Sequence, residues 1–226
     1  MNNARWALFA SVVITVVLFY APYGTLIGYP LILLSTVAHE LGHGIAALLT
    51  GGRFDSLQIH ADASGVAYTA TSGRLASAIV SAGGLVGPAV VAGGLFATGR
   101  HPRLARTALG LLGVGLLAAD VLLVRNLFGF MFIGILGGLA LHTAVARTAE
   151  TARFAVVFVA VQLSLSVFSR ADYLFTPVAR TANGDMPSDV ARMAEALLLP
   201  YWFWGGACGL FSILVLVVGI WNYLRR

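Results

Sequence analysis

Residues 30–50 read PLILLSTVAHELGHGIAALLT, and this stretch decides the fold class. At about 20 residues it is long enough to cross the hydrocarbon layer of a bilayer as a helix. Its middle contains His39, Glu40 and His43, side chains that are costly to place in hydrocarbon. Polar groups of this kind inside a membrane span indicate a functional site. The stretch therefore predicts a transmembrane helix that carries chemistry.

The rest of the chain has the composition of a polytopic membrane protein. Of its 226 residues, 59% are hydrophobic and 10% are charged, whereas a soluble domain carries about 25% charged residues. There is too little polar side chain to cover a globule in water, so a soluble fold is excluded. The 14 basic residues are all arginines, scattered singly between apolar runs. This distribution excludes a nucleic-acid partner.

Apolar runs along the chain predict an all-α polytopic membrane protein with six to seven transmembrane helices. The number is open because Arg125 and Asn126 are the only break between the fourth and fifth runs, which form either a tight hairpin or one span and a partly inserted segment. No domain boundary or repeat interrupts the chain, so 1–226 is expected to be a single membrane domain. The runs are 6–20, 30–50, 75–98, 104–124, 127–146, 154–169 and 201–223.

Two polar segments lie between these runs. Residues 51–74 contain two alternating apolar and polar stretches, Ser56–His60 and Gly65–Thr69, around a turn-like sequence. This pattern predicts a short membrane-associated β-hairpin directly after the polar helix. In residues 170–200, a short amphipathic helix is expected over Val190–Leu199, with Ser188 or Asp189 as its N-cap.

The spacing of His39, Glu40 and His43 forms an H-E-x-x-H motif. Residues four apart lie one turn apart on a helix, so both imidazoles project from one face and can bind one zinc ion. Glu40 adjoins the first histidine and is placed to take a proton from water as a general base. The alternative is a polar cluster that only packs helices together.

A catalytic zinc ion usually has three protein ligands and one open position. Asp120 is the strongest candidate for the third ligand, because it lies inside an apolar run where a buried carboxylate needs a cation. The alternatives for Asp120 are pairing with Arg125 or a position at the helix end. If Asp120 is not the ligand, His142 or an acidic residue of the 170–200 segment folding back over the core is expected instead.

These residues together resemble the site-2 protease family of intramembrane zinc metalloproteases, in particular its small bacterial members without a PDZ domain. The resemblance rests on HELGHG at 39–44, on the glycine-rich SAGGLVGP at 81–88 and on Asp120 in the next run. It covers about residues 30–130, which correspond to the family's catalytic core. Residues 1–29 and 131–226 are then accessory helices.

One element departs from the family pattern. The family's usual third-ligand element is an Asn-Pro-rich stretch that ends in Asp-Gly, whereas Asp120 is followed by Val121, and the nearest asparagine, Asn126, comes after it. On this resemblance Asn126 is a candidate for oxyanion stabilisation or substrate binding.

The resemblance implies a zinc-dependent endopeptidase that hydrolyses transmembrane or membrane-proximal protein substrates and holds one Zn²⁺ per chain. It also implies a multi-pass protein of the bacterial plasma membrane. A substrate helix must unwind before attack, and strand addition to an exposed β edge can hold the unwound segment. We expect the hairpin to supply this edge, with Ile59 and Tyr68 as the positions to test.

Two other functions use the same motif. Some metal transporters place H-E-x-x-H in a helix, but they pair it with ligands on the preceding helix, and the run 6–20 contains no His, Asp or Glu. A zinc-binding pseudoprotease is the other alternative, although the intact Glu40 disfavours it.

Overall fold

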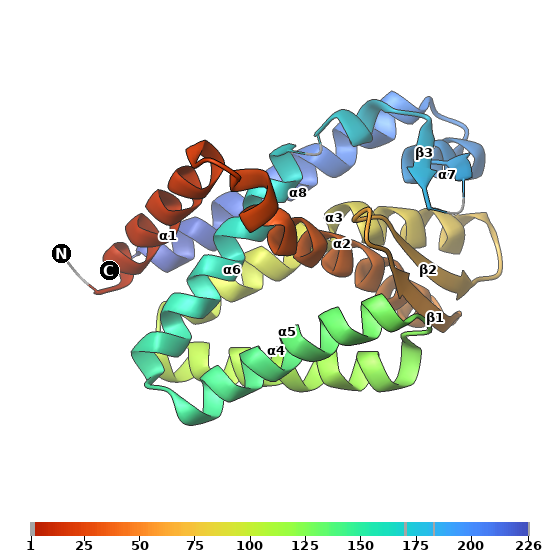
Figure 1. The fold of residues 1–226 in the computed structure, drawn as a ribbon. Coiled ribbons are helices and arrows are strands. Elements are labelled where there is room, and N and C mark those ends of the chain that lie inside the picture. Colours follow the sequence, from red (N-terminus) through yellow and green to blue (C-terminus); the bar gives the residue numbers. More distant parts are fainter. Residues whose placement is uncertain (1–2, 170, 183, 226) are drawn as a thin grey trace.

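A computed structural model of the chain describes residues 3–169, 171–182 and 184–225. Long helices run roughly side by side, and the two small sheets gather at one end of the bundle (Figure 1). The beginning of α1 and the end of α8 lie at the opposite end (Figure 1). The long helices are α1 (Asn3–Tyr20), α2 (Gly24–Leu49), α3 (Arg74–Gly99), α4 (Pro102–Leu123), α5 (Leu127–Ala146), α6 (Ala149–Ser169) and α8 (Tyr201–Leu224).

Six helices in the described ranges are long and apolar enough to cross a membrane. The apolar part of α1, Arg5–Leu18, is shorter than these six. Many large apolar side chains on the outer faces are exposed, among them Leu111 at 69% and Leu214 at 55%, as expected for helices surrounded by lipid. The predicted all-α polytopic fold is therefore confirmed.

The predicted hairpin after the polar helix is also confirmed. β1 (Arg53–Ile59) pairs antiparallel with β2 (Gly65–Ala70). His60 donates its backbone N–H to the Ser64 carbonyl at 2.9 Å, and Ala63 adopts a left-handed conformation with φ of 65°. These features are typical of a three-residue hairpin loop.

The segment between α6 and α8 contains more structure than the single helix predicted there. A 3₁₀ helix (Ala171–Phe175) leads into a second antiparallel hairpin of β3 (Val178–Thr181) and β4 (Gly184–Pro187), and α7 (Asp189–Leu197) follows. Ser188 caps α7 by accepting a hydrogen bond from the Ala191 N–H at 3.3 Å, as the sequence predicts. The strands were not predicted, because four-residue strands leave almost no periodic pattern.

The core that positions the site lies where α3 crosses α2, α6 and α8 (Figure 1). Small side chains on α3 and α6, such as Ala89, Ala92 and Ala160, are completely buried there. Small residues at these contacts let helix backbones approach closely, which is the main source of helix packing in lipid. α7 also packs against the first half of α3. The same helix, α3, therefore supports both α2, which contains the H-E-x-x-H motif, and the segment that follows α6.

Candidate active site

The H-E-x-x-H motif lies on a regular part of α2, and its two imidazoles face one another. The ring centroids of His39 and His43 are 4.7 Å apart with an interplanar angle of 89°, and their Nε2 atoms are 3.1 Å apart. One helical turn therefore brings two nitrogen donors to a single point, as the spacing predicts.

Asp189, the first residue of α7, completes this arrangement from the far end of the sequence. Its two carboxylate oxygens lie 3.2 Å from His39 Nε2 and 3.4 Å from His43 Nε2. One ligand atom from each of the three residues lies within 4.8 Å of the others, and this is the group found in the described part of the chain with the spacing of a metal site.

The charge of Asp189 is set by two opposing effects. Burial of its side chain disfavours the carboxylate, yet the imidazoles of His43 and His39 attract and hydrogen-bond it, and together they hold the pKa of Asp189 well below its usual range. Tyr173 donates its hydroxyl hydrogen to the same carboxylate at 3.4 Å. The Asp189 carboxylate is therefore held between two imidazoles and a phenol hydroxyl.

The hydrogen bond made by Nδ1 of His43 determines which of its two ring nitrogens can bind a metal. Its Nδ1 lies 2.8 Å from the backbone carbonyl of Val80 on α3, so Nδ1 carries an N–H donor, and Nε2, which faces His39 and Asp189, is the nitrogen that can bind a metal once it gives up its proton. Gly84, one turn further along α3, lies directly against the His43 ring, which occupies the space that a Cβ at this position would need. Two imidazole nitrogens and one carboxylate form a donor set that suits a catalytic zinc ion, so the residues fit this metal.

Glu40 lies beside the three donors and is only 6% exposed. The backbone of Gly65, at the start of β2, covers it, because a Cβ there would come within 2.7 Å of Glu40 Cγ. Thr36, one turn earlier on α2, donates its hydroxyl hydrogen to the Ala63 carbonyl at 2.8 Å and so attaches the hairpin loop to the helix. The hairpin is thus held against the residue expected to act as the base.

Two cavities meet at Glu40 and His39. The larger, about 450 Å³, extends along α2 between α6 and α8 and is lined by small polar residues, including Ser35 and Ser212, as well as by Leu85. The smaller, about 90 Å³, lies between β2 and the segment with β3 and β4, and it contains the His43 and Asp189 side chains in its wall. The larger cavity gives small groups access to His39 and Glu40, and the smaller one gives access to all three donors.

The β2 edge that lines the smaller cavity is open. Because His60 and Ser64 form a hydrogen-bonded pair, the alternate residues Gly65 and Ala67 point their backbone N–H and C=O groups away from β1. Gly65 and Ala67 both line the smaller cavity. In the described residues the sheet has two strands only, so these groups face the site.

The outer edge of β1 is already occupied. Asn126, between α4 and α5, accepts a hydrogen bond from the Ile59 N–H at 3.2 Å and donates one to the Ile59 carbonyl at 2.6 Å. The Arg125 N–H binds the Leu57 carbonyl at 3.0 Å. The structure therefore places Asn126 and Ile59 against each other and not at the three donors, and Ile59 itself is completely buried.

Tyr68 has a different environment from the one expected for a substrate-binding position. It is the partner of Ser56 in the hairpin register, which by alternation is a hydrogen-bonded pair. Its backbone groups are therefore used within the hairpin, and its side chain is 43% exposed.

The structure does not bring Asp120 to the histidines. Asp120 is 3% exposed and faces α5, where its Oδ2 would lie 3.0 Å from a Cβ at Gly134. Its Oδ1 has no hydrogen-bond partner in the described chain. The Arg125 guanidinium instead donates to the carbonyls of Val124 and Leu122. Asp120 lies in an apolar run, as expected, but the Asp120 side chain points into the contact between α4 and α5.

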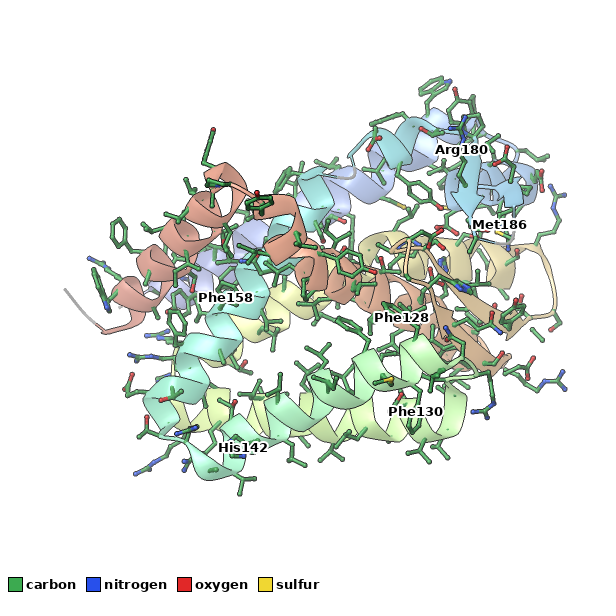
Figure 2. The ribbon with its side chains drawn as sticks, viewed as in Figure 1. Phe128, Phe130, His142, Phe158, Arg180 and Met186 are labelled. Atoms are coloured by element: carbon green, nitrogen blue, oxygen red, sulfur yellow. The ribbon has the colours of Figure 1, made fainter. Side chains whose placement is uncertain are left out.

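His142 is exposed near the end of α5, at the opposite end of the bundle from the hairpins (Figure 2). Asp189 is one of the acidic residues of the 170–200 segment, which the sequence argument kept as an alternative to Asp120 without naming this position, and Tyr173 was not singled out at all. The sequence carried one indication for Asp189, since a Ser-Asp pair before an amphipathic stretch predicts a carboxylate in the first turn of a helix.

Comparison with known proteins gives one match. A family model described as Peptidase M50B-like matches residues 9–219, which includes the motif, both hairpins and Asp189. No curated protein and no solved structure shows a significant match.

Proposed function

The chain belongs to the Peptidase M50B-like family, which is the site-2 protease family of membrane metallopeptidases, and from this premise we propose that it is an intramembrane zinc endopeptidase of the bacterial plasma membrane. Its substrates are transmembrane or membrane-proximal segments of other proteins. The observation that carries the proposal is the convergence of His39, His43 and Asp189 beside Glu40.

We propose His39, His43 and Asp189 as the ligands of one zinc ion per chain. Asp189 takes the place that the sequence argument gave to Asp120, because ligation needs convergence of donor atoms and Asp120 faces α5. When bound, zinc would polarise the scissile carbonyl and lower the pKa of a water molecule, so that hydroxide is available as the nucleophile at neutral pH. Since Asp189 lies outside 30–130, the catalytic unit extends into the last third of this single domain.

Glu40 handles the protons of the reaction. It accepts a proton as water attacks the carbonyl carbon, and it returns that proton to the amide nitrogen as the C–N bond breaks. Its burial beneath Gly65 limits the contact of its carboxylate with bulk water on the side of the hairpin.

The substrate main chain adds as a strand to β2 at Gly65 and Ala67. This assignment replaces Ile59 and Tyr68, because Gly65 and Ala67 direct free backbone groups into the cavity that holds Asp189. A helical substrate hides its carbonyls in its own hydrogen bonds, and pairing with β2 compensates for unwinding it.

The test is proteolysis of a transmembrane substrate in liposomes by the wild type and by Glu40→Gln, with bound zinc measured in both. Glu40→Gln should abolish cleavage and retain zinc, because Glu40 moves protons and is not a ligand. Glu195→Gln is the matched control, since Glu195 is an exposed side chain on α7. Near wild-type turnover by Glu40→Gln would refute the general-base role.

The same preparation separates the two other functions. A metal transporter would move zinc across the liposome membrane whether or not a substrate protein is present. A pseudoprotease would bind zinc and the substrate without cleaving it. Cleavage that stops on chelation and returns with zinc is expected only of the endopeptidase.

A further inference from the structure

Tyr173, in the 3₁₀ helix between α6 and β3, is a polar side chain that contacts two of the three donor residues and that the proposed reaction does not yet use. Its ring stands edge-on to His39, with centroids 6.0 Å apart and an interplanar angle of 78°. Its hydroxyl lies 3.4 Å from Asp189 Oδ2. It lines both cavities that meet at Glu40.

Hydrolysis of a peptide places negative charge on the oxygen of the scissile carbonyl, and a fixed donor beside that oxygen stabilises the transition state. The sequence argument offered Asn126 for this task. The Asn126 amide instead makes both of its hydrogen bonds to Ile59, on the edge of the hairpin away from β2.

A phenol suits the task, because its hydroxyl group donates one hydrogen bond and carries no charge that would compete with the substrate for a metal. Arg192 is the other donor-rich side chain in the smaller cavity, but its Nε donates to the Pro187 carbonyl at 3.3 Å. Tyr173 alone of the two lines both cavities and contacts two of the proposed ligands.

We propose that Tyr173 is a catalytic residue whose hydroxyl donates a hydrogen bond to the oxygen of the scissile carbonyl as that oxygen gains negative charge. In the absence of substrate the same hydroxyl donates to Asp189, and it turns to the substrate during the reaction. This role rests on the proposed function. No covalent bond to Tyr173 is formed, and its proton stays on the phenol.

The decisive variant is Tyr173→Phe, which keeps the ring against His39 and removes only the hydroxyl. It should lower kcat about 100- to 1,000-fold while KM and bound zinc remain within about twofold of wild type. Tyr201→Phe is the matched control, because Tyr201 packs in the same cluster as Tyr173 and lines neither cavity.

A binding measurement separates this role from support of a ligand. A phosphinate peptide imitates the tetrahedral oxyanion, whereas a hydroxamate of the same peptide binds metal without that geometry. Tyr173→Phe should weaken the phosphinate by about the factor lost in kcat and leave the hydroxamate nearly unchanged.

Three results would overturn the role: loss of zinc, equal weakening of both inhibitors, or unchanged kcat in Tyr173→Phe. The first two would show that Tyr173 only holds Asp189 in place. Failure of the proposed function looks different, since wild type and Tyr173→Phe would then both lack chelator-sensitive proteolysis, while zinc and inhibitor binding still report on Tyr173.

Discussion

The end of α4 and the beginning of α7 each carry a buried aspartate, and the two regions have opposite characters. Asp120 lies in an apolar, membrane-spanning helix and meets the backbone of α5. Asp189 lies in a nine-residue amphipathic helix and meets two imidazoles. Burial of a carboxylate in hydrocarbon thus indicates that it needs a partner, but it does not say which partner. Convergence of donor atoms is the observation that favours Asp189 as the proposed ligand.

The largest effect should come from replacing each of the two aspartates by alanine in a separate variant. Asp189→Ala removes a proposed ligand, so zinc affinity should fall by more than about 100-fold, since even loss of an outer-shell partner costs 10–100-fold, and proteolysis should disappear. Asp120→Ala should keep one zinc ion per chain. Metal analysis after dialysis against a weak chelator measures both. Zinc loss confined to Asp120→Ala would reverse the comparison and restore Asp120 as the ligand.

A second test compares proline at neighbouring positions of β2. Ala67→Pro removes an N–H that points to the open edge, where proline is tolerated, so the fold should survive and kcat/KM should fall about 10- to 100-fold. Tyr68→Pro removes an N–H used inside the hairpin and should lower stability as well. Ala67→Ser, which keeps the N–H, is the control. Equal cleavage by Ala67→Pro and wild type would argue against strand addition.

Asn126 tests the region next to Asp120 through a smaller effect. Asn126→Ala leaves the Ile59 N–H and C=O without partners in a buried place, which should cost about 1–3 kcal/mol of stability. Thermal unfolding in detergent should begin ~2–4 °C lower for each kcal/mol lost, with zinc still bound. A drop in kcat without any loss of stability would instead support the oxyanion role first expected of Asn126.

The smallest effect is expected for His142. Because it is exposed at the end of α5 away from the hairpins, His142→Ala should leave zinc content and turnover within about twofold of wild type, as is usual for surface substitutions. A stoichiometric loss of zinc in this variant would instead make His142 a zinc ligand. The helices would then have to be arranged differently, and neither aspartate could be judged from the present arrangement.

The sequence predicted those parts of the molecule whose signals are local. Hydropathy located the spans, strict alternation located the first hairpin, and the spacing of His39 and His43 located the two nitrogen donors. The N-cap at Ser188 was also visible, because capping depends on residues a few positions apart.

The proposed third ligand was expected only as an alternative, an unnamed acidic residue of the 170–200 segment, because its position depends on tertiary packing. Asp189 reaches α2 only through the packing of α7 on α3 and α8, which no local pattern encodes. Asp120 was preferred because an apolar neighbourhood is visible in sequence, whereas a polar segment that folds back over the core reads as an ordinary loop. The open edge at Gly65 and Ala67 was missed for a related reason, since the register of a hairpin decides which backbone groups remain free.

The position of Asp189 so late in the chain also has a consequence for how the enzyme is made. The ribosome completes His43 about 150 residues before Asp189, which at 5–20 residues per second is on the order of ten seconds or more of synthesis. During that interval the growing chain inserts α3 to α6 with an incomplete donor set. A truncated or stalled product that ends before α7 therefore lacks the proposed third ligand, so zinc binding with all three residues has to wait until nearly the whole chain has been made.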